Sequence, residues 1–303
     1  MEWVDGLING FNGLFPPGNF FNSPLNVCAL LAILLTGLAC GSVGGLVVGN
    51  RMAFFSDALA HCAFAGVALG ILFCLIAQVP QEQFRHWITP VMVGFGVVIG
   101  LLIAWVRNRT GLANDTVIGV FFAFAVGLGA VFMKLASQRI RVFNPESFLF
   151  GDPLLATPLD LLYLTCLLAL CFAFLLRFYN EMILTSVSPS LALSRNIRVT
   201  LLRYLFVLLL GLLVNLCLQV AGILLINGLL IVPAAAAANL SRNLRQFFRW
   251  TIAITVAAGL GGQWLSWEIS NRFDRTDLGI TGPIVVLCCA AFFLSMILGR
   301  SRQ

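Results

Sequence analysis

Long apolar runs constrain this chain more than any other feature of its sequence. Each run is about 20 residues long, the length a helix needs to cross the hydrocarbon core of a bilayer. Short charged or Pro/Gly-rich segments separate one run from the next. Of the 303 residues, 60% are hydrophobic and only 10% are charged, whereas soluble domains have about 25% charged residues. Such a chain cannot cover a soluble surface, so the sequence predicts an all-α integral membrane protein.

The positions of these runs predict a polytopic bundle of about nine transmembrane helices. The predicted spans are residues 26–49, 56–79, 87–106, 116–135, 159–178, 199–218, 222–240, 248–269 and 282–298. Little chain remains for a soluble domain, so residues 1–303 are predicted to form a single transmembrane domain. Residues 1–5 are acidic and lack the basic start of a cleavable signal peptide, so the first span, from about residue 26, is expected to stay as an anchor.

Arginine positions predict the orientation. With nine spans and the N-terminus outside, twelve of the 18 basic residues fall in cytoplasmic segments. These twelve are Arg51, Arg107, Arg109, Arg177, Arg195, Arg198, Arg203, Arg242, Arg245, Arg249, Arg300 and Arg302. Because cytoplasmic loops are enriched in Lys and Arg, the sequence favours an N-out, C-in topology. The net charge of +6 is scattered over short loops, so no nucleic-acid partner is expected.

All nine cysteines fall inside apolar runs. They are Cys28, Cys40, Cys62, Cys74, Cys166, Cys171, Cys217, Cys288 and Cys289. None stands in a loop with Cys-x-x-Cys spacing, which argues against a metal knuckle or a redox motif. We interpret them as small apolar residues that pack between helices.

A carboxylate and an imidazole stand four residues apart in the second span, which is rich in Ala and Gly. Asp57 and His61 therefore share one helical face. Ionisable residues at membrane depth usually mark functional sites, and one oxygen with one nitrogen suits zinc, manganese or iron. Two other interpretations stay open: Ser56 or Asp57 caps the helix start, or His61 is a core histidine bonded to a nearby carbonyl. With so few large side chains, this span is expected to lie centrally among other helices.

Other polar residues at membrane depth have structural explanations beside functional ones. Asp115 opens the fourth span, where an N-terminal cap is the simplest role. Asn215, Gln219 and Asn227 are expected to form interhelical hydrogen bonds. Pro233 is expected to kink the seventh span.

Residues 179–198 are predicted to form the longest cytoplasmic loop. Within it, Ser188 followed by Pro189 is typical of a short helix that begins with a serine cap and proline in the first turn. A short helix on the cytoplasmic face suits docking of a soluble partner, although an ordinary interfacial turn explains the pattern equally.

Catalytic motifs are missing from the sequence. It contains no P-loop pattern, and Lys134 is the only lysine. With His61 and His86 as the only histidines, a histidine-rich catalytic metal site is excluded. The chain is therefore not expected to be an enzyme or to hold a permanent cofactor.

Several segments, in order along the chain, resemble one transporter family. Residues 51–61 (R-M-A-F-F-S-D-A-L-A-H) and 66–70 (G-V-A-L-G) resemble the permease subunits of bacterial ATP-driven (ABC) importers for zinc, manganese or iron. The further similar segments are 115–119 (D-T-V-I-G), 149–155 (L-F-G-D-P-L-L), 187–192 (V-S-P-S-L-A), 221–235 and 282–283. Two departures are Ser56, where the family commonly has Gly, and Cys62, where Ala or Ser is usual. Cys62 points about 100° away from His61 around the helix and is not expected to be a ligand.

The resemblance implies a metal-importer permease fold and a homodimer in the bacterial inner membrane. It implies separate ATPase subunits and an extracytoplasmic metal-binding protein as partners. Asp57 and His61, and also Asp115, would then contact the transported divalent metal ion, which is cargo and not a cofactor.

The resemblance also implies which residues couple the permease to its ATPase. They are Ser188, Pro189, Leu191 and Ala192. The Met52 position and the Ala-Leu-Ala-His sequence favour zinc over manganese or iron. The alternative function is a secondary, ion-coupled cation transporter.

Overall fold

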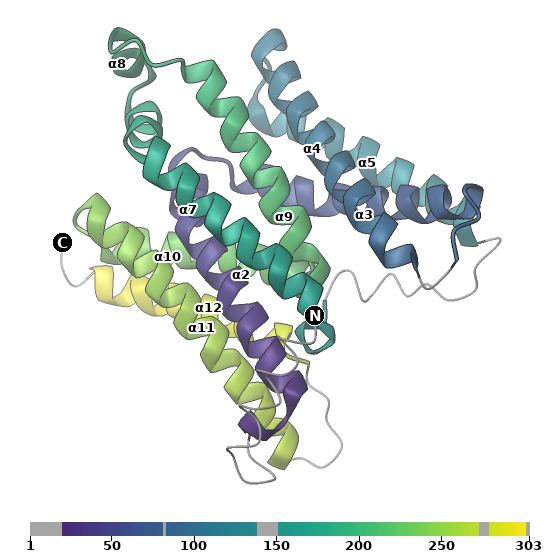
Figure 1. The fold of residues 1–303 in the computed structure, drawn as a ribbon. Coiled ribbons are helices and arrows are strands. Elements are labelled where there is room, and N and C mark those ends of the chain that lie inside the picture. Colours follow the sequence, from purple (N-terminus) through teal and green to yellow (C-terminus); the bar gives the residue numbers. More distant parts are fainter. Residues whose placement is uncertain (1–19, 81–82, 138–150, 273–278, 301–303) are drawn as a thin grey trace. The chain divides into compact units, whose positions relative to one another are not determined.

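The computed structural model describes residues 20–80, 83–137, 151–272 and 279–300, and every regular element within these segments is a helix (Figure 1). The all-α fold class is therefore confirmed. Several features used above lie outside the described residues. They are residues 1–5, residues 149–150 and Arg302.

The helices follow the predicted spans closely, with two short 3-10 helices between them. They are η1 (Phe20–Asn22), α2 (Pro24–Gly49), α3 (Ala53–Ile76), α4 (Phe84–Thr110), α5 (Asn114–Ser137), η3 (Pro153–Leu155), α7 (Pro158–Val187), α8 (Pro189–Ser194), α9 (Val199–Leu230), α10 (Val232–Leu240), α11 (Leu244–Arg272) and α12 (Thr281–Arg300).

Within the described residues, seven helical stretches are long and apolar enough to cross a membrane, which agrees with a multi-pass membrane protein. One of them, Val199–Leu240, has 42 residues. At 1.5 Å per residue it would reach about 63 Å, twice the thickness of the hydrocarbon core, so it covers both the sixth and the seventh predicted spans. The eighth predicted span lies within α11, which is more polar and is not among the seven. The N-out, C-in orientation stays a prediction.

The second half of this long stretch is broken twice. Gly222 has φ 74° and ψ 167°, a conformation that is open to glycine alone among the residues. A second interruption at Ile231 precedes Pro233, which lies in the first turn of α10. The kink predicted at Pro233 is confirmed, whereas the break at Gly222 was not predicted.

The chain forms two compact units. One consists of Met1–Val48, Leu149–Ala173 and Gln219–Gln303, and the other consists of Gly49–Phe148 and Phe174–Leu218. We refer to them as unit 1 and unit 2. The sequence predicts that both units belong to a single permease domain, and this stays a prediction.

In unit 2, α3 lies against α4 and α5, with which it makes its most extensive contacts (Figure 1). A Cβ atom on Gly66 would lie 3.0 Å from the Cα of Met92, and one on Gly70 would lie 3.1 Å from the Cα of Ile88. Small residues thus let the α3 and α4 backbones approach closely. The central position predicted for the second span is confirmed within this unit.

In unit 1, a glycine loop packs against the break in α9. Gly151 has φ 60°, and a Cβ atom on it would collide with the peptide that joins Ala221 to Gly222. Directly after this glycine, the Asp152 carboxylate accepts a hydrogen bond from the Leu154 backbone N–H at 3.0 Å and caps η3. Two segments that both resemble the transporter family therefore meet at a pair of glycines.

Candidate functional site

Asp57 and His61 lie one turn apart on α3, as their spacing predicts. The Nδ1 atom of His61 is 3.5 Å from the Oδ1 atom of Asp57. The His61 side chain is 31% exposed and the Asp57 side chain 40% exposed. Neighbouring residues on the other faces of α3, such as Ser56 and Cys62, are fully buried. The pair thus forms a half-exposed polar site beside buried residues of the same helix.

The His61 ring is held from two sides. Its Nδ1 donates a hydrogen bond to the backbone carbonyl of Asp57 at 3.0 Å, because a carbonyl can only accept. The ring also packs against the Phe122 ring of α5 in a T-shaped arrangement, with ring centroids 5.0 Å apart. With the proton on Nδ1, the lone pair of the imidazole is on Nε2. The alternative of a histidine bonded to a nearby carbonyl therefore describes part of this geometry, although the ring is not buried in a core.

The capping interpretation of this segment is wrong. The residue that precedes α3 is Met52, and it makes no side-chain capping bond. Ser56 donates its hydroxyl back to the carbonyl of Ala53 at 2.7 Å, and Asp57 is the fifth residue of the helix. The free N–H groups at a helix start belong to its first turn, so a carboxylate in the second turn is not placed there to cap them.

The separation within the pair fits two ligands of one metal ion. Ligand atoms about 2.1 Å from a zinc ion at a tetrahedral angle are about 3.4 Å apart. The observed 3.5 Å between Nδ1 and Oδ1 is close to this value, and it is long for a hydrogen bond. The two atoms are therefore spaced as two ligands of one cation would be, although Nδ1 holds a proton that it donates to the Asp57 carbonyl.

Asp115 does not join the pair. It is exposed in the first turn of α5, and it precedes Phe122 by seven residues, or about 10 Å along the helix. Among the described residues, no group of three or more His, Cys, Asp and Glu side chains is placed to hold a metal ion. A role of Asp115 in transport stays a prediction.

The predicted coupling segment contains a helix with a defined beginning and end. Ser188 Oγ accepts a hydrogen bond from the Leu191 N–H at 3.4 Å and caps α8, with Pro189 in its first turn. After the helix, Asn196 has φ 59°, and its N–H bonds to the Leu193 carbonyl while the Ile197 N–H bonds to that of Ala192. This pair of bonds is a Schellman motif, with asparagine in the left-handed position. The short helix predicted from Ser188 and Pro189 is confirmed.

The side chains of α8 are buried on one side of the helix and exposed on the other. Ala192 is fully buried, whereas Leu191 is 57% exposed and Leu193 63% exposed. One correction concerns the segment before this helix. Residues 179–187 were expected in a loop, but they form the last turns of α7, whose apolar positions continue through Met182 to Val187.

The hydrogen bonds predicted between helices differ in part from those observed. The Asn215 side chain is fully buried and donates to the Gly211 carbonyl of its own helix at 2.7 Å. An interhelical bond that was not predicted runs from Gln263 Nε2 in α11 to the Asn26 carbonyl in α2, at 3.1 Å. All nine cysteines are free thiols, as expected.

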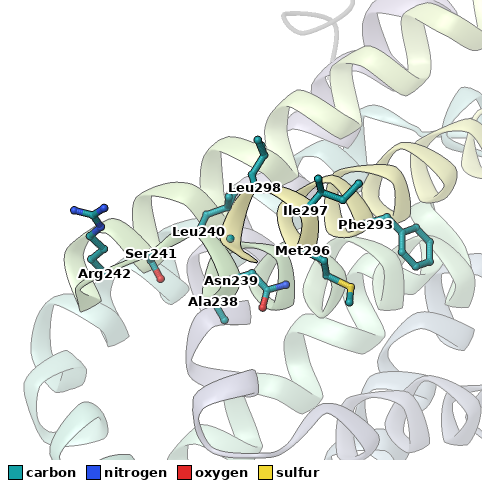
Figure 2. A pocket seen from close by; sticks show the side chains of 10 residues that line it. Ala238, Asn239, Leu240, Ser241, Arg242, Phe293, Met296, Ile297 and Leu298 are labelled. Atoms are coloured by element: carbon teal, nitrogen blue, oxygen red, sulfur yellow. The ribbon is translucent and has the colours of Figure 1, made fainter. Parts of the chain in front are cut away.

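One large cavity contains none of the predicted functional residues. It measures about 960 Å³ and lies in unit 1 between the end of α10 and α12. Figure 2 shows Phe293 and Met296 on one side of it and the Arg242 side chain extending away from them. Nearby, Asn239 donates a hydrogen bond to Ser295 at 3.1 Å and ties α10 to α12. The predicted metal ligands Asp57 and His61 are thus in the other unit.

Comparison with known proteins identifies the family. The model of the ABC 3 transport family matches residues 23–299. The chain belongs to this family. The resemblance seen in its sequence segments is therefore confirmed.

Individual relatives cover almost the whole chain. High-affinity zinc uptake system membrane protein ZnuB of Haemophilus influenzae is 30% identical over 274 residues, which are 90% of this chain and 97% of that protein. Manganese import system permease protein ScaB of Streptococcus gordonii is 27% identical over 266 residues, 88% of each chain. The solved structure of PsaBC from Streptococcus pneumoniae in complex with Fab matches with a TM-score of 0.72 at 22% identity, over 97% of this chain and 94% of that one. This last likeness concerns the fold.

Proposed function

We propose that this chain is the membrane permease subunit of an ATP-driven importer for a divalent transition-metal ion, and that Asp57 and His61 bind the ion in transit. The observation that carries the proposal is the carboxylate–imidazole pair on α3, with ligand atoms 3.5 Å apart. The family membership and the metals named for the relatives support it.

The pair suits an ion that must leave again. Two protein ligands leave other coordination positions to water or to a second copy of the chain, whereas a complete cage of four would hold zinc tightly. The Nδ1 atom must also give up its hydrogen bond to the Asp57 carbonyl before it binds metal. Both features weaken binding, which is what a translocation step requires.

The position of the pair suggests where the step takes place. Arg51 lies in the turn just before α3, and Asp57 lies four residues, or about 6 Å, beyond Ala53 at the start of the helix. If Arg51 marks the cytoplasmic edge, the pair lies in the inner half of the membrane.

Zinc is the proposed cargo, ahead of manganese or iron. Imidazole is a preferred ligand of zinc, whereas manganese is usually bound by oxygen. This chain is 30% identical to the relative named for zinc and 27% identical to the one named for manganese. Because these identities are so close, transport measurements must include both metals and ferrous iron.

The proposed partners follow from the same function. ATP hydrolysis takes place on a separate ATPase that docks at α8, an extracytoplasmic metal-binding protein delivers the ion, and a second copy of this chain completes the pathway. This chain is then the transport subunit and not an enzyme.

Metal uptake by intact cells tests the proposal. Asp57→Asn and His61→Ala, introduced at the native locus, are each expected to abolish uptake of the transported metal while membrane abundance stays unchanged. His86→Ala removes the other histidine, which is exposed at the start of α4, and serves as the matched control with normal uptake. Normal uptake by the Asp57 or His61 variant would contradict the site. Uptake that persists after ATP depletion but stops when ion gradients collapse would instead identify a secondary transporter.

A further inference from the structure

Three arginines converge on one cavity in unit 2. Arg51 lies in the turn between α2 and α3, Arg107 in the last turns of α4, and Arg203 near the start of α9. All three line a cavity of about 270 Å³, and all three also line a small apolar void of about 20 Å³. Residues far apart in the sequence thus contribute three positive charges to one place.

Within the described segments, no carboxylate lines the space around these charges. Neither lining contains an Asp or a Glu, and Arg107 and Arg203 are near enough to repel each other. The arginine ion pairs among the described residues lie elsewhere, in Arg177–Glu181 and Arg272–Glu268. Arg107 and Arg203 are half-buried, whereas Arg51 is exposed. Charged groups that are partly withdrawn from water, as these two are, need a partner. An anion from outside the chain would supply it.

The walls of the cavity favour an anion that only accepts hydrogen bonds. Met52, Met182 and Phe206 are almost fully buried and form an apolar floor. The hydroxyl groups of Thr185 and Ser186 donate to backbone carbonyls of α7, at 2.7 and 2.8 Å. Among the lining side chains, the three arginines are therefore the strongest hydrogen-bond donors, and the apolar residues beside them strengthen their attraction for an anion.

The backbone at Arg51 is unusual. Its φ angle is 55°, in the left-handed region that an arginine seldom adopts. Such conformations persist where the surrounding structure holds them, and they concentrate at functional sites. Here the unusual residue is one of the three that line the cavity.

We propose that this cavity binds a phosphate group, either in the headgroup of an anionic phospholipid or as free inorganic phosphate. Guanidinium groups bind phosphate oxygens in bidentate pairs, and a phosphate offers more oxygens and more charge to three arginines than a single carboxylate does. The volume is below the range of about 300–1,000 Å³ that is typical of pockets for larger ligands. The inner leaflet supplies anionic lipid at this level if Arg51, Arg107 and Arg203 are cytoplasmic, as the sequence predicts.

The location gives the bound phosphate a structural effect. Ser186 and Pro189 also line the cavity, so its occupant contacts the corner between α7 and α8. Phosphate binding would therefore hold the base of α8 in place. This proposal does not depend on the metal site.

Thermal unfolding of the purified full-length protein in a zwitterionic detergent tests the proposal. One arm adds inorganic phosphate against chloride at equal ionic strength, and the other adds phosphatidylglycerol against phosphatidylcholine. We expect the unfolding midpoint to rise by about 3 °C when the ligand is tenfold above its dissociation constant. Arg107→Gln, Arg203→Gln and Arg51→Asn should each remove this rise, and asparagine tolerates the backbone at position 51. Arg109→Gln is the matched control, since Arg109 is exposed on the same helix and lines neither space.

Each outcome decides the proposal. Protection by phosphatidylglycerol alone identifies a lipid site, and protection by inorganic phosphate as well identifies a general phosphate site. No protection by either, or protection that survives Arg107→Gln, would overturn the proposal. A third result would also overturn it: phosphate and lipid have no effect, and Arg107→Gln prevents co-purification of the ATPase. The cavity would then bind an acidic side chain of the partner.

Discussion

Helices α3 and α8 belong to the same unit but are stabilised in different ways. The first residue before α3 offers no capping side chain, and the helix is fixed by close packing of Gly66 and Gly70 against α4. The short α8 buries only Ala192 and is fixed at its two ends by Ser188 and Asn196. Packing supports the helix that contains the predicted metal ligands, whereas caps support the helix that exposes Leu191 and Leu193. The predictions below test this difference, from the largest expected effect to the smallest.

Replacement of Gly66 by leucine should have the largest effect. The added side chain would begin 3.0 Å from the Cα of Met92, and overpacking of this kind costs about 1–3 kcal/mol or more. We expect loss of most folded protein, measured by size-exclusion chromatography of detergent extracts. Gly119→Ala in α5 is the control, since a Cβ atom there has no neighbour within 4 Å. Equal yields from both variants would show that α3 is not fixed by packing.

Asp57 and His61, the proposed metal ligands on α3, should act together at one site. Asp57→Asn and His61→Gln are each expected to lower uptake in reconstituted vesicles by at least about 100-fold, or 2.7 kcal/mol in the transition state. Because one missing ligand already disables the site, the double variant should be no worse than the more severe single variant. Losses that multiply in the double variant would mean that the two residues act at separate places.

The exposed side of α8 should respond to charge. Leu191→Glu places a carboxylate on the exposed side of the helix, and we expect ATPase activity to continue without metal transport while the protein still inserts into the membrane. Ser190→Glu is the control, because it adds the same charge in the first turn of α8, where a negative charge is favourable. This variant should still transport metal. Transport that is unchanged in the Leu191 variant would place ATPase docking elsewhere.

Removal of the α8 cap should have a smaller, local effect. Ser188→Ala removes the acceptor of the Leu191 N–H and should cost about 1 kcal/mol. Hydrogen exchange of residues 189–194 should then be about fivefold faster, while exchange of α3 stays the same. Faster exchange in both helices would show that α8 is not an independent element.

The end of α8 gives the smallest expected effect, with the opposite sign. Asn196→Gly retains the left-handed backbone, which glycine adopts at less cost than asparagine. Exchange of α8 should slow slightly, by an amount that corresponds to a few tenths of a kcal/mol. Alanine disfavours the left-handed backbone conformation, so Asn196→Ala should accelerate hydrogen exchange of α8.

The sequence predicts local features of this fold better than features that depend on distant contacts. Apolar run length locates the spans, and the i, i+4 spacing of Asp57 and His61 places them on one face. The Ser188–Pro189 signal locates α8. Each of these depends on residues close together in the chain.

Other features arise only when distant segments meet. Arg51, Arg107 and Arg203 are more than 50 residues apart from one another, and only the packing of α3, α4 and α9 brings them to one cavity. The break at Gly222 also escaped prediction, because glycine is common in membrane helices and its left-handed conformation here accompanies contact with Gly151. The end of α7 was missed because its apolar pattern continues past the charged residues that suggested a loop.

The capped ends of α8 also bear on the free energy of docking. An isolated segment of six residues would be unfolded in water, and ordering it on a partner would cost about 1–2 kcal/mol of conformational entropy per residue. In this protein that entropy is already lost when the chain folds. A partner that binds Leu191 and Leu193 therefore meets a rigid helix, and nearly all of its contact energy is available for affinity.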